Sequence, residues 1–134
     1  EVCVYAVDRL GRDSIDVLCV DLYDHAAASP VLDSEDFYRD CHALLAEGGV
    51  LSVNLFGRDA SFERSAQRIA DVFGATQIAS LRPTREGNTV VVALKVTPWP
   101  DREALAARAD NIEARFQLPA RKWLRMIRPW VAKQ

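Results

Sequence analysis

The 134-residue chain carries 17 Lys and Arg residues against 19 Asp and Glu, a formal net charge of −2, and 49% of its residues are hydrophobic. This composition predicts one folded domain and excludes a disordered chain, and the charge gives no general attraction to nucleic acid or an acidic membrane. Without a spanning apolar run or a signal peptide, we expect a cytoplasmic protein with no membrane and no nucleic-acid partner.

The chain opens in a strand-like run without an initiator methionine, which indicates a cut sequence. Residues 2–6 are predicted to form a short strand, and residues 7–10 a helical turn or a loop. The next apolar run, Val17-Leu18-Cys19-Val20, does not alternate with polar residues. This pattern is typical of a strand that is covered on both faces, and we expect it over residues 16–21.

Two acids frame the turn after this strand. Asp21 ends the strand and Asp24 follows three residues later. Ligands bind at the carboxyl ends of parallel strands in open α/β sheets, so both acids are site candidates. An acid that simply caps the turn fits the sequence equally well.

A helix is predicted after the loop of residues 25–30, with Ser34 as its N-cap. Gly48-Gly49 is predicted to end this helix and to open a strand over residues 50–56. The glycine pair would lie at the wrong helix end for anion binding, so we interpret it as structural.

A second helix is predicted to start at Asp59 or Ser61 and to end at Gly74. Its buried stripe consists of Phe62, Ala66, Ile69 and Phe73. Residues 76–81 and 89–96 then read as an antiparallel hairpin. The order predicts an α/β fold with right-handed parallel crossovers that finishes in antiparallel strands.

Two further helices are predicted after residues 98–100. The first has Leu105, Ala109, Ile112 and Phe116 at helical spacing, and the second has Trp123, Ile127 and Trp130. The second is also basic, and we expect it to dock on the body of the protein rather than on a membrane or an acidic partner. Residues 1–98 would then form the α/β domain and residues 99–134 a helical extension.

The three cysteines, Cys3, Cys19 and Cys41, show neither C-x-x-C spacing nor a histidine at the spacing of a metal site. We therefore expect structural thiols and no metal site.

Residues 16–96 carry a family resemblance. The motifs D-V-L-x-V-D-x-x-D, L-x-S-x-x-F-Y and L-L-x-x-G-G-V-L-x-V-N-L follow one another in this order. They resemble the spermidine synthase (polyamine aminopropyltransferase) family and short bacterial spermidine-synthase-like proteins of unassigned activity. The resemblance implies the C-terminal half of a Rossmann-like sheet, the AdoMet-dependent methyltransferase-like fold.

The resemblance also implies roles for residues near the two acids. In the family, an aminopropyl group passes from decarboxylated S-adenosylmethionine to the amine of putrescine, and carboxylates bind the cationic amine and accept its proton. Asp21 matches the general base and Asp24 the acid that holds the diamine. Tyr23 would form an aromatic wall of the site or would simply pack.

The sequence also departs from the family pattern. His25-Ala26-Ala27-Ala28-Ser29-Pro30 replaces a Pro and a Gly-Pro pair, Asn54 stands where many synthases carry Gln, and Tyr5-Ala6 stands where the family has an Asp-Ala or Asp-Gly pair. No glycine-rich turn precedes Asp16, so we expect no cofactor in this chain. Decarboxylated S-adenosylmethionine or S-adenosylmethionine would be the co-substrate of a longer parent protein.

The sequence thus predicts a fragment of a spermidine-synthase-like protein, inactive alone, whose parent is a transferase acting on a polyamine or another small molecule. Whether the parent is an enzyme stays open at this point. The alternatives are a methyltransferase-like domain without aminopropyl transfer and a non-catalytic association domain. Because the strand at residues 16–21 would have an uncovered edge, we also expect a homodimer.

Overall fold

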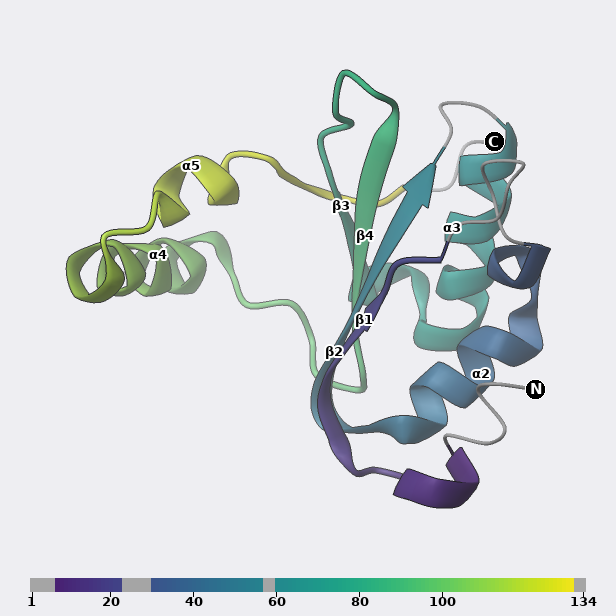
Figure 1. Cartoon of the computed structure of the whole chain (residues 1–134). Coiled ribbons are helices and arrows are strands. Elements are labelled where there is room, and N and C mark those ends of the chain that lie inside the picture. Colours follow the sequence, from purple (N-terminus) through teal and green to yellow (C-terminus); the bar gives the residue numbers. More distant parts are fainter. Residues whose placement is uncertain (1–6, 23–29, 57–59, 132–134) are drawn as a thin grey trace.

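The computed structural model describes residues 7–22, 30–56 and 60–131 (Figure 1). After a helical turn over residues 7–10, the elements are β1 (Ile15–Val20), η1 (Pro30–Asp33), α2 (Glu35–Leu44), β2 (Leu45–Phe56), α3 (Ala60–Phe73), η2 (Ala75–Gln77), β3 (Ile78–Leu81), β4 (Asn88–Leu94), α4 (Arg102–Phe116), α5 (Ala120–Leu124) and β5 (Ile127–Pro129). The strand predicted over residues 2–6 lies outside the described residues. None of the described helices is long and apolar enough to cross a membrane.

The strands form one sheet in the order β1-β2-β4-β3-β5. β1 and β2 are parallel, and every other neighbouring pair is antiparallel. The predicted α/β class, with parallel strands followed by an antiparallel hairpin, is therefore confirmed. The helices α2 and α3 cover one face of the sheet, whereas α4 and α5 extend away on the other side (Figure 1).

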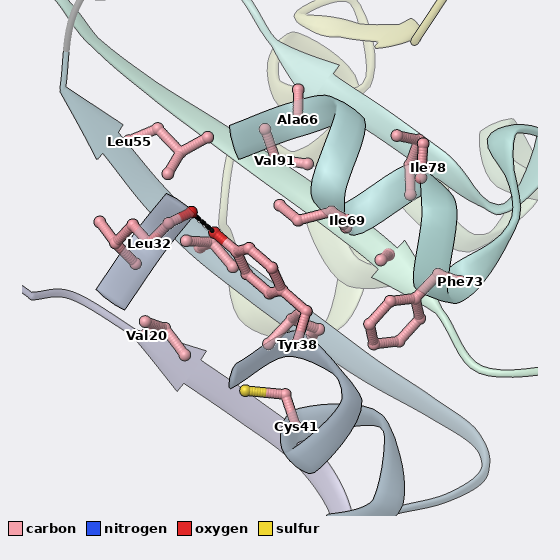
Figure 2. Packing of buried hydrophobic residues seen from close by; sticks show 14 of the residues in the cluster. Val20, Leu32, Tyr38, Cys41, Leu55, Ala66, Ile69, Phe73, Ile78 and Val91 are labelled. Atoms are coloured by element: carbon pink, nitrogen blue, oxygen red, sulfur yellow. Dashed lines mark hydrogen bonds between the residues drawn. The ribbon is translucent and has the colours of Figure 1, made fainter. Parts of the chain in front are cut away.

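The core lies between the sheet and the helices α2 and α3 (Figure 2). Alternate residues of β2 and β4 face it and are at most 2% exposed: Leu51, Val53, Leu55, Val91 and Ala93. The stripe predicted on α3 is confirmed, since Ala66, Ile69 and Phe73 are buried and Phe62 packs beside them. Burial of each large apolar side chain contributes about 1.5–3 kcal/mol.

The start of α2 also lies where the sequence predicts it. Ser34 has extended backbone angles, and its hydroxyl oxygen accepts a hydrogen bond from the backbone N–H of Phe37 at 3.3 Å. Glu35 and Asp36 occupy the first turn, where negative charge is favoured by the helix dipole.

The predicted role of Gly48-Gly49 is wrong. α2 ends at Leu44 and β2 begins at Leu45, so both glycines lie inside the strand. The pairing of β2 with β1 shifts register here. Gly48 has a φ of 76°, and a Cβ on Gly49 would lie 2.8 Å from the carbonyl oxygen of Ala46. The glycines therefore permit a bulge in β2 rather than ending the helix.

The second C-terminal helix is much shorter than predicted. α5 ends at Leu124, and residues 127–129 form β5 along the edge of β3. Pro129 disfavours a helical conformation at the residue before it, whereas proline is tolerated on an edge strand. Trp130, which was predicted to share a helix with Trp123, instead joins the core at 9% exposure.

The helix α4 forms as predicted, but its apolar stripe is not covered. Asp101 caps the helix by accepting a hydrogen bond from the backbone N–H of Ala104 at 2.7 Å. Of the four stripe residues only Ala109 is buried, and Phe116 is 58% exposed. Among the described elements, α4 packs mainly against α5.

Lys95, directly after β4, is a buried charge that joins several elements. Its Nζ donates hydrogen bonds to Asp13 Oδ1 at 2.7 Å, to the carbonyl oxygen of His42 at 2.7 Å and to that of Leu45 at 2.6 Å. These three acceptors use all three N–H donors of a lysine ammonium. A cation is also favoured here because the two carbonyls belong to the C-terminal end of α2.

Lys95→Met should lower the free energy of unfolding by about 2–4 kcal/mol, because methionine fills the space but removes the hydrogen bonds to the part-buried carbonyl of His42 and the buried carbonyl of Leu45. Urea denaturation followed by circular dichroism measures this change. Lys122→Met, at an exposed lysine on α5, is the matched control and should shift the value by no more than about 0.5 kcal/mol. Equal, small effects of both substitutions would contradict the role of Lys95.

Candidate functional site

Asp21 and Asn54 meet at one end of the parallel strand pair. The register places Val20 of β1 beside Val53 of β2, so the residues that follow them also lie side by side. Asn54 Nδ2 donates a hydrogen bond to Asp21 Oδ1 at 3.1 Å. Asp21 is exposed, so its carboxylate is accessible to a ligand at the carboxyl end of β1.

Of the three predicted site residues, Asp21, Tyr23 and Asp24, the structure describes Asp21. Tyr23 and Asp24 lie outside the described residues. Their roles, and the pairing of the two acids on one amine, stay predictions.

Side chains of α2 and α3 hold η1, the segment that follows residues 23–29, which the structure does not describe. Tyr38 of α2 is fully buried, and its hydroxyl donates a hydrogen bond to the carbonyl oxygen of Leu32 in η1 at 2.9 Å (Figure 2). Burial raises the pKa of Tyr38 far above its usual range, which keeps the donor neutral. From α3, Ser65 Oγ donates to Asp33 Oδ1 at 2.8 Å, and Arg64 lies 3.5 Å from the same carboxylate.

Sequence reasoning used Tyr38 only as part of a motif and did not predict this contact. The hydrogen bond joins residues six apart, and no local pattern marks it. Lys95 was missed as well, although a signal existed. It continues the inward-facing alternation of Thr89, Val91 and Ala93, which is an unusual place for a charge.

A polar cavity of about 480 Å³ lies at the opposite end of β1 and β2. It is lined by Arg12, Asp13, Glu35, Arg39, His42, Ala43, Asp71, Val72 and Lys95. Several of its charges already serve the fold: Lys95 is bound as described, and Arg39 pairs with Glu35 and with Asp36. We interpret this cavity as structural.

The titratable groups in this cavity are perturbed by their surroundings. The hydrogen bond from Lys95 lowers the pKa of Asp13. Burial, and then the charge of Lys95, lower the pKa of His42. The His42 ring packs edge-on against Phe73, with the ring centroids 5.0 Å apart. These contacts favour a charged Asp13 and a neutral His42.

A second cavity, of about 590 Å³, separates the helices α4 and α5 from β3 and β5. It is mainly apolar and includes Trp99, Leu105, Leu124 and Trp130. Among the described residues that line it, Arg102 alone is ionisable. These lining residues therefore offer no acid–base pair for catalysis.

The described residues contain no cluster of three or more His, Cys, Asp or Glu side chains that could hold a metal ion. The thiol of Cys41 is buried in the core, whereas Cys19 is exposed on β1. Cys3 lies outside the described residues.

The sequence is similar to curated polyamine aminopropyltransferases. It is 32% identical over 114 residues to that of Chromobacterium violaceum and 28% identical over 117 residues to that of Neisseria meningitidis. These matches include 82% and 87% of this chain but 42% and 44% of the relatives. The chain thus spans about two fifths of their length. No protein-family model matches the sequence.

Solved structures of spermidine synthases are also similar to this chain. A spermidine synthase crystallised with the transition-state analogue AdoDATO matches with a TM-score of 0.59 and 25% identity, over 79% of this chain and 39% of that one. A probable spermidine synthase from Corynebacterium glutamicum matches with a TM-score of 0.57 over 92% of this chain and 49% of that one; at 20% identity, this match shows the fold alone. The predicted methyltransferase-like fold is therefore confirmed.

His42→Gln should flatten the pH dependence of the free energy of unfolding between about pH 7 and pH 5. Because the folded pKa of His42 is lowered, the unfolded chain takes up a proton that the folded chain resists. The wild-type protein therefore loses stability as the pH falls below about 6.5, the unfolded value. Urea denaturation at a series of pH values measures this slope.

Parallel profiles for His42→Gln and the wild-type protein would show that burial of His42 does not set the pH dependence.

Proposed function

Because this chain is spermidine-synthase-like over about four fifths of its length, we propose that it supplies the amine-acceptor side of an aminopropyltransferase site. The full reaction would belong to a protein that also contains a donor-binding region. The observation that carries the proposal is the accessible Asp21 carboxylate, held by Asn54 at the carboxyl ends of two parallel strands.

The proposed reaction is a substitution at carbon. The neutral amine of a polyamine attacks the aminopropyl carbon that is bonded to the sulfonium sulfur of decarboxylated S-adenosylmethionine. A new C–N bond forms, the C–S bond breaks, and methylthioadenosine leaves with the bonding electron pair. The amine is a cation in water, so a carboxylate must take one of its protons to produce the nucleophile.

We assign this proton transfer to Asp21. A carboxylate attracts the ammonium form of the substrate and then accepts its proton, so one group can serve both steps. The hydrogen bond from Asn54 Nδ2 occupies Oδ1 and holds the carboxylate in one orientation. Asp24 would bind the amine next to it, and Tyr23 would form an aromatic wall.

We further propose that this chain by itself does not bind the nucleoside donor. On this fold, a nucleoside binds over a glycine-rich turn after the first strand and an acid after the second. The 134 residues contain one glycine before Asp16, Gly11, which lies in a polar segment. The donor, decarboxylated S-adenosylmethionine or S-adenosylmethionine, would be bound by residues outside this sequence.

The isolated chain should show no binding of S-adenosylmethionine, its decarboxylated form, methylthioadenosine or AdoDATO in isothermal titration calorimetry. The reason is the missing glycine-rich turn. The spermidine synthase crystallised with AdoDATO is the positive control for that ligand. Dissociation constants in the micromolar range for the isolated chain would overturn this part of the proposal.

Asp21→Asn should reduce aminopropyl transfer by about 100-fold or more in a protein that joins this chain to a donor-binding region, because the amide keeps the shape but cannot accept the proton. Asp24→Asn should mainly raise KM for the amine. The matched control is Asp16→Asn, at an exposed acid of β1 outside the site.

Turnover is measured by release of methylthioadenosine. Transfer that survives Asp21→Asn unchanged would remove the assignment of the base, and methyl transfer without aminopropyl transfer would favour a methyltransferase.

A further inference from the structure

The cavity of about 590 Å³ between α4, α5, β3 and β5 has the size and the walls of a small-molecule site. Such sites are concave and mostly apolar, enclose about 300–1,000 Å³ and contain a few polar groups that orient the ligand. The start of α4, the end of α5 and residues of β3 and β5 all contribute to the walls. The cavity is separate from the Asp21 site, because β1 and β5 lie at opposite ends of the sheet order.

Two indole rings form part of the apolar wall and are held by contacts within the chain. The indole N–H of Trp99 donates a hydrogen bond to the carbonyl oxygen of Gln77 at 2.8 Å. Trp130 is 9% exposed, and its backbone N–H donates to the carbonyl oxygen of Ile78 at 3.3 Å. Aromatic surface is thus in place before a ligand binds. The rest of the apolar wall includes the half-buried side chains of Leu105, Leu124 and Ile127.

Trp130 also has a polar atom that the described residues leave without a partner. Its indole Nε1 is buried and has no hydrogen-bond acceptor among them. Unpaired buried donors are rare in native structures, because desolvation of the N–H group is costly. Since Trp130 lines the cavity, a bound molecule with an acceptor atom satisfies this donor once the side chains that cover the nitrogen shift.

Arg102 gives the cavity a positive charge on its exposed side. The residue is exposed, and none of the salt bridges between described residues includes it. Asp101 and Glu103 flank it in the sequence, but neither lines the cavity. Arg102 is also the first residue of α4, where the helix dipole favours negative charge. A guanidinium forms paired hydrogen bonds with a carboxylate, so an anionic group fits best here.

We propose that this cavity binds a small amphipathic carboxylate. The apolar part of the ligand contacts the indole rings of Trp99 and Trp130, its carboxylate pairs with Arg102, and a second acceptor atom takes the N–H of Trp130. A polyamine is a poor fit, because its ammonium groups would approach Arg102 and meet no carboxylate in the described lining. The site is therefore different from the proposed amine site, and the proposal does not rest on aminopropyl transfer.

Isothermal titration calorimetry of the 134-residue chain tests the proposal with three aromatic probes. Phenylpropionate carries the carboxylate, hydroxyphenylpropionate adds an acceptor atom, and phenylpropylamine joins the same ring to a cation. We expect the hydroxy acid to bind most tightly. The amine should bind at least about tenfold more weakly than either acid, because it loses the charged hydrogen bonds to Arg102.

Variants and the indole signals locate the ligand. Arg102→Gln should weaken phenylpropionate binding about tenfold or more and should not weaken binding of the amine. Arg108→Gln is the matched control, at an exposed arginine of α4 that does not line the cavity, and should leave the affinities unchanged. In nuclear magnetic resonance spectra, the indole N–H signal of Trp130 should shift on binding and that of the exposed Trp123 should not. Trp123→Phe and Trp99→Phe assign the signals of the three tryptophans.

No binding of any of the three probes would overturn the proposal. So would equal affinities for acid and amine, or an unchanged affinity for phenylpropionate in Arg102→Gln, because the cavity would then take apolar molecules regardless of charge. A shift of the Trp123 signal in place of that of Trp130 would assign binding to the exposed surface of α5 and would also overturn it. Circular dichroism checks that each variant is folded.

Discussion

The hydrogen bonds of Lys95 hold together the parts of the structure on which the site depends. One buried ammonium connects Asp13 before β1, the C-terminal end of α2 and the first residue of β2. These contacts tie β1 and β2 together at their starts; after the register shift at the bulge, the pairing runs from Val17 with Val50 to Val20 with Val53. A slip of one residue would turn Asn54 to the other face of the sheet, away from Asp21. The contact between Asp21 and Asn54 thus depends on the register of β1 and β2, while Lys95 holds the other end of the two strands.

The two ends of the parallel pair differ in how their polar groups are used. At the starts of the strands, the cations and carboxylates bind one another and stabilise the fold. At the ends, Asp21 is exposed, with one carboxylate oxygen bound by Asn54. The hydrogen bonds from Tyr38 to Leu32 and from Ser65 to Asp33 fix the segment that returns from this end. A carboxylate that is oriented but accessible, beside a fixed segment, is what recognition of a cationic amine requires.

Outside the core, several large apolar side chains are exposed. The chain spans about two fifths of the curated relatives that it matches. One face of its sheet is covered by α2 and α3. Large apolar side chains remain exposed on β1 (Val17) and on the segment of α4 and α5 (Phe116, Leu118 and Trp123). Residues 102–134 contain eight Lys and Arg against three Asp and Glu, whereas residues 1–101 contain nine against sixteen.

The sequence by itself determined the features that depend on local pattern: the strand that ends just before Asp21, the cap at Ser34, the stripe of α3 and the hairpin of β3 and β4. The prediction that this strand is covered on both faces is wrong for the described residues, because Val17 is 61% exposed and Cys19 is exposed as well. The sequence also identified Asp21 as a site candidate and noted Asn54, but not that the two side chains bond. Tertiary structure decided where α2 ends, because the donor for its last carbonyls is Lys95, some fifty residues away. It also decided that residues 127–129 form a strand, because helical spacing of apolar residues cannot reveal that the edge of β3 is open for pairing. Contacts between distant segments, which leave no periodic pattern in either segment, set these features.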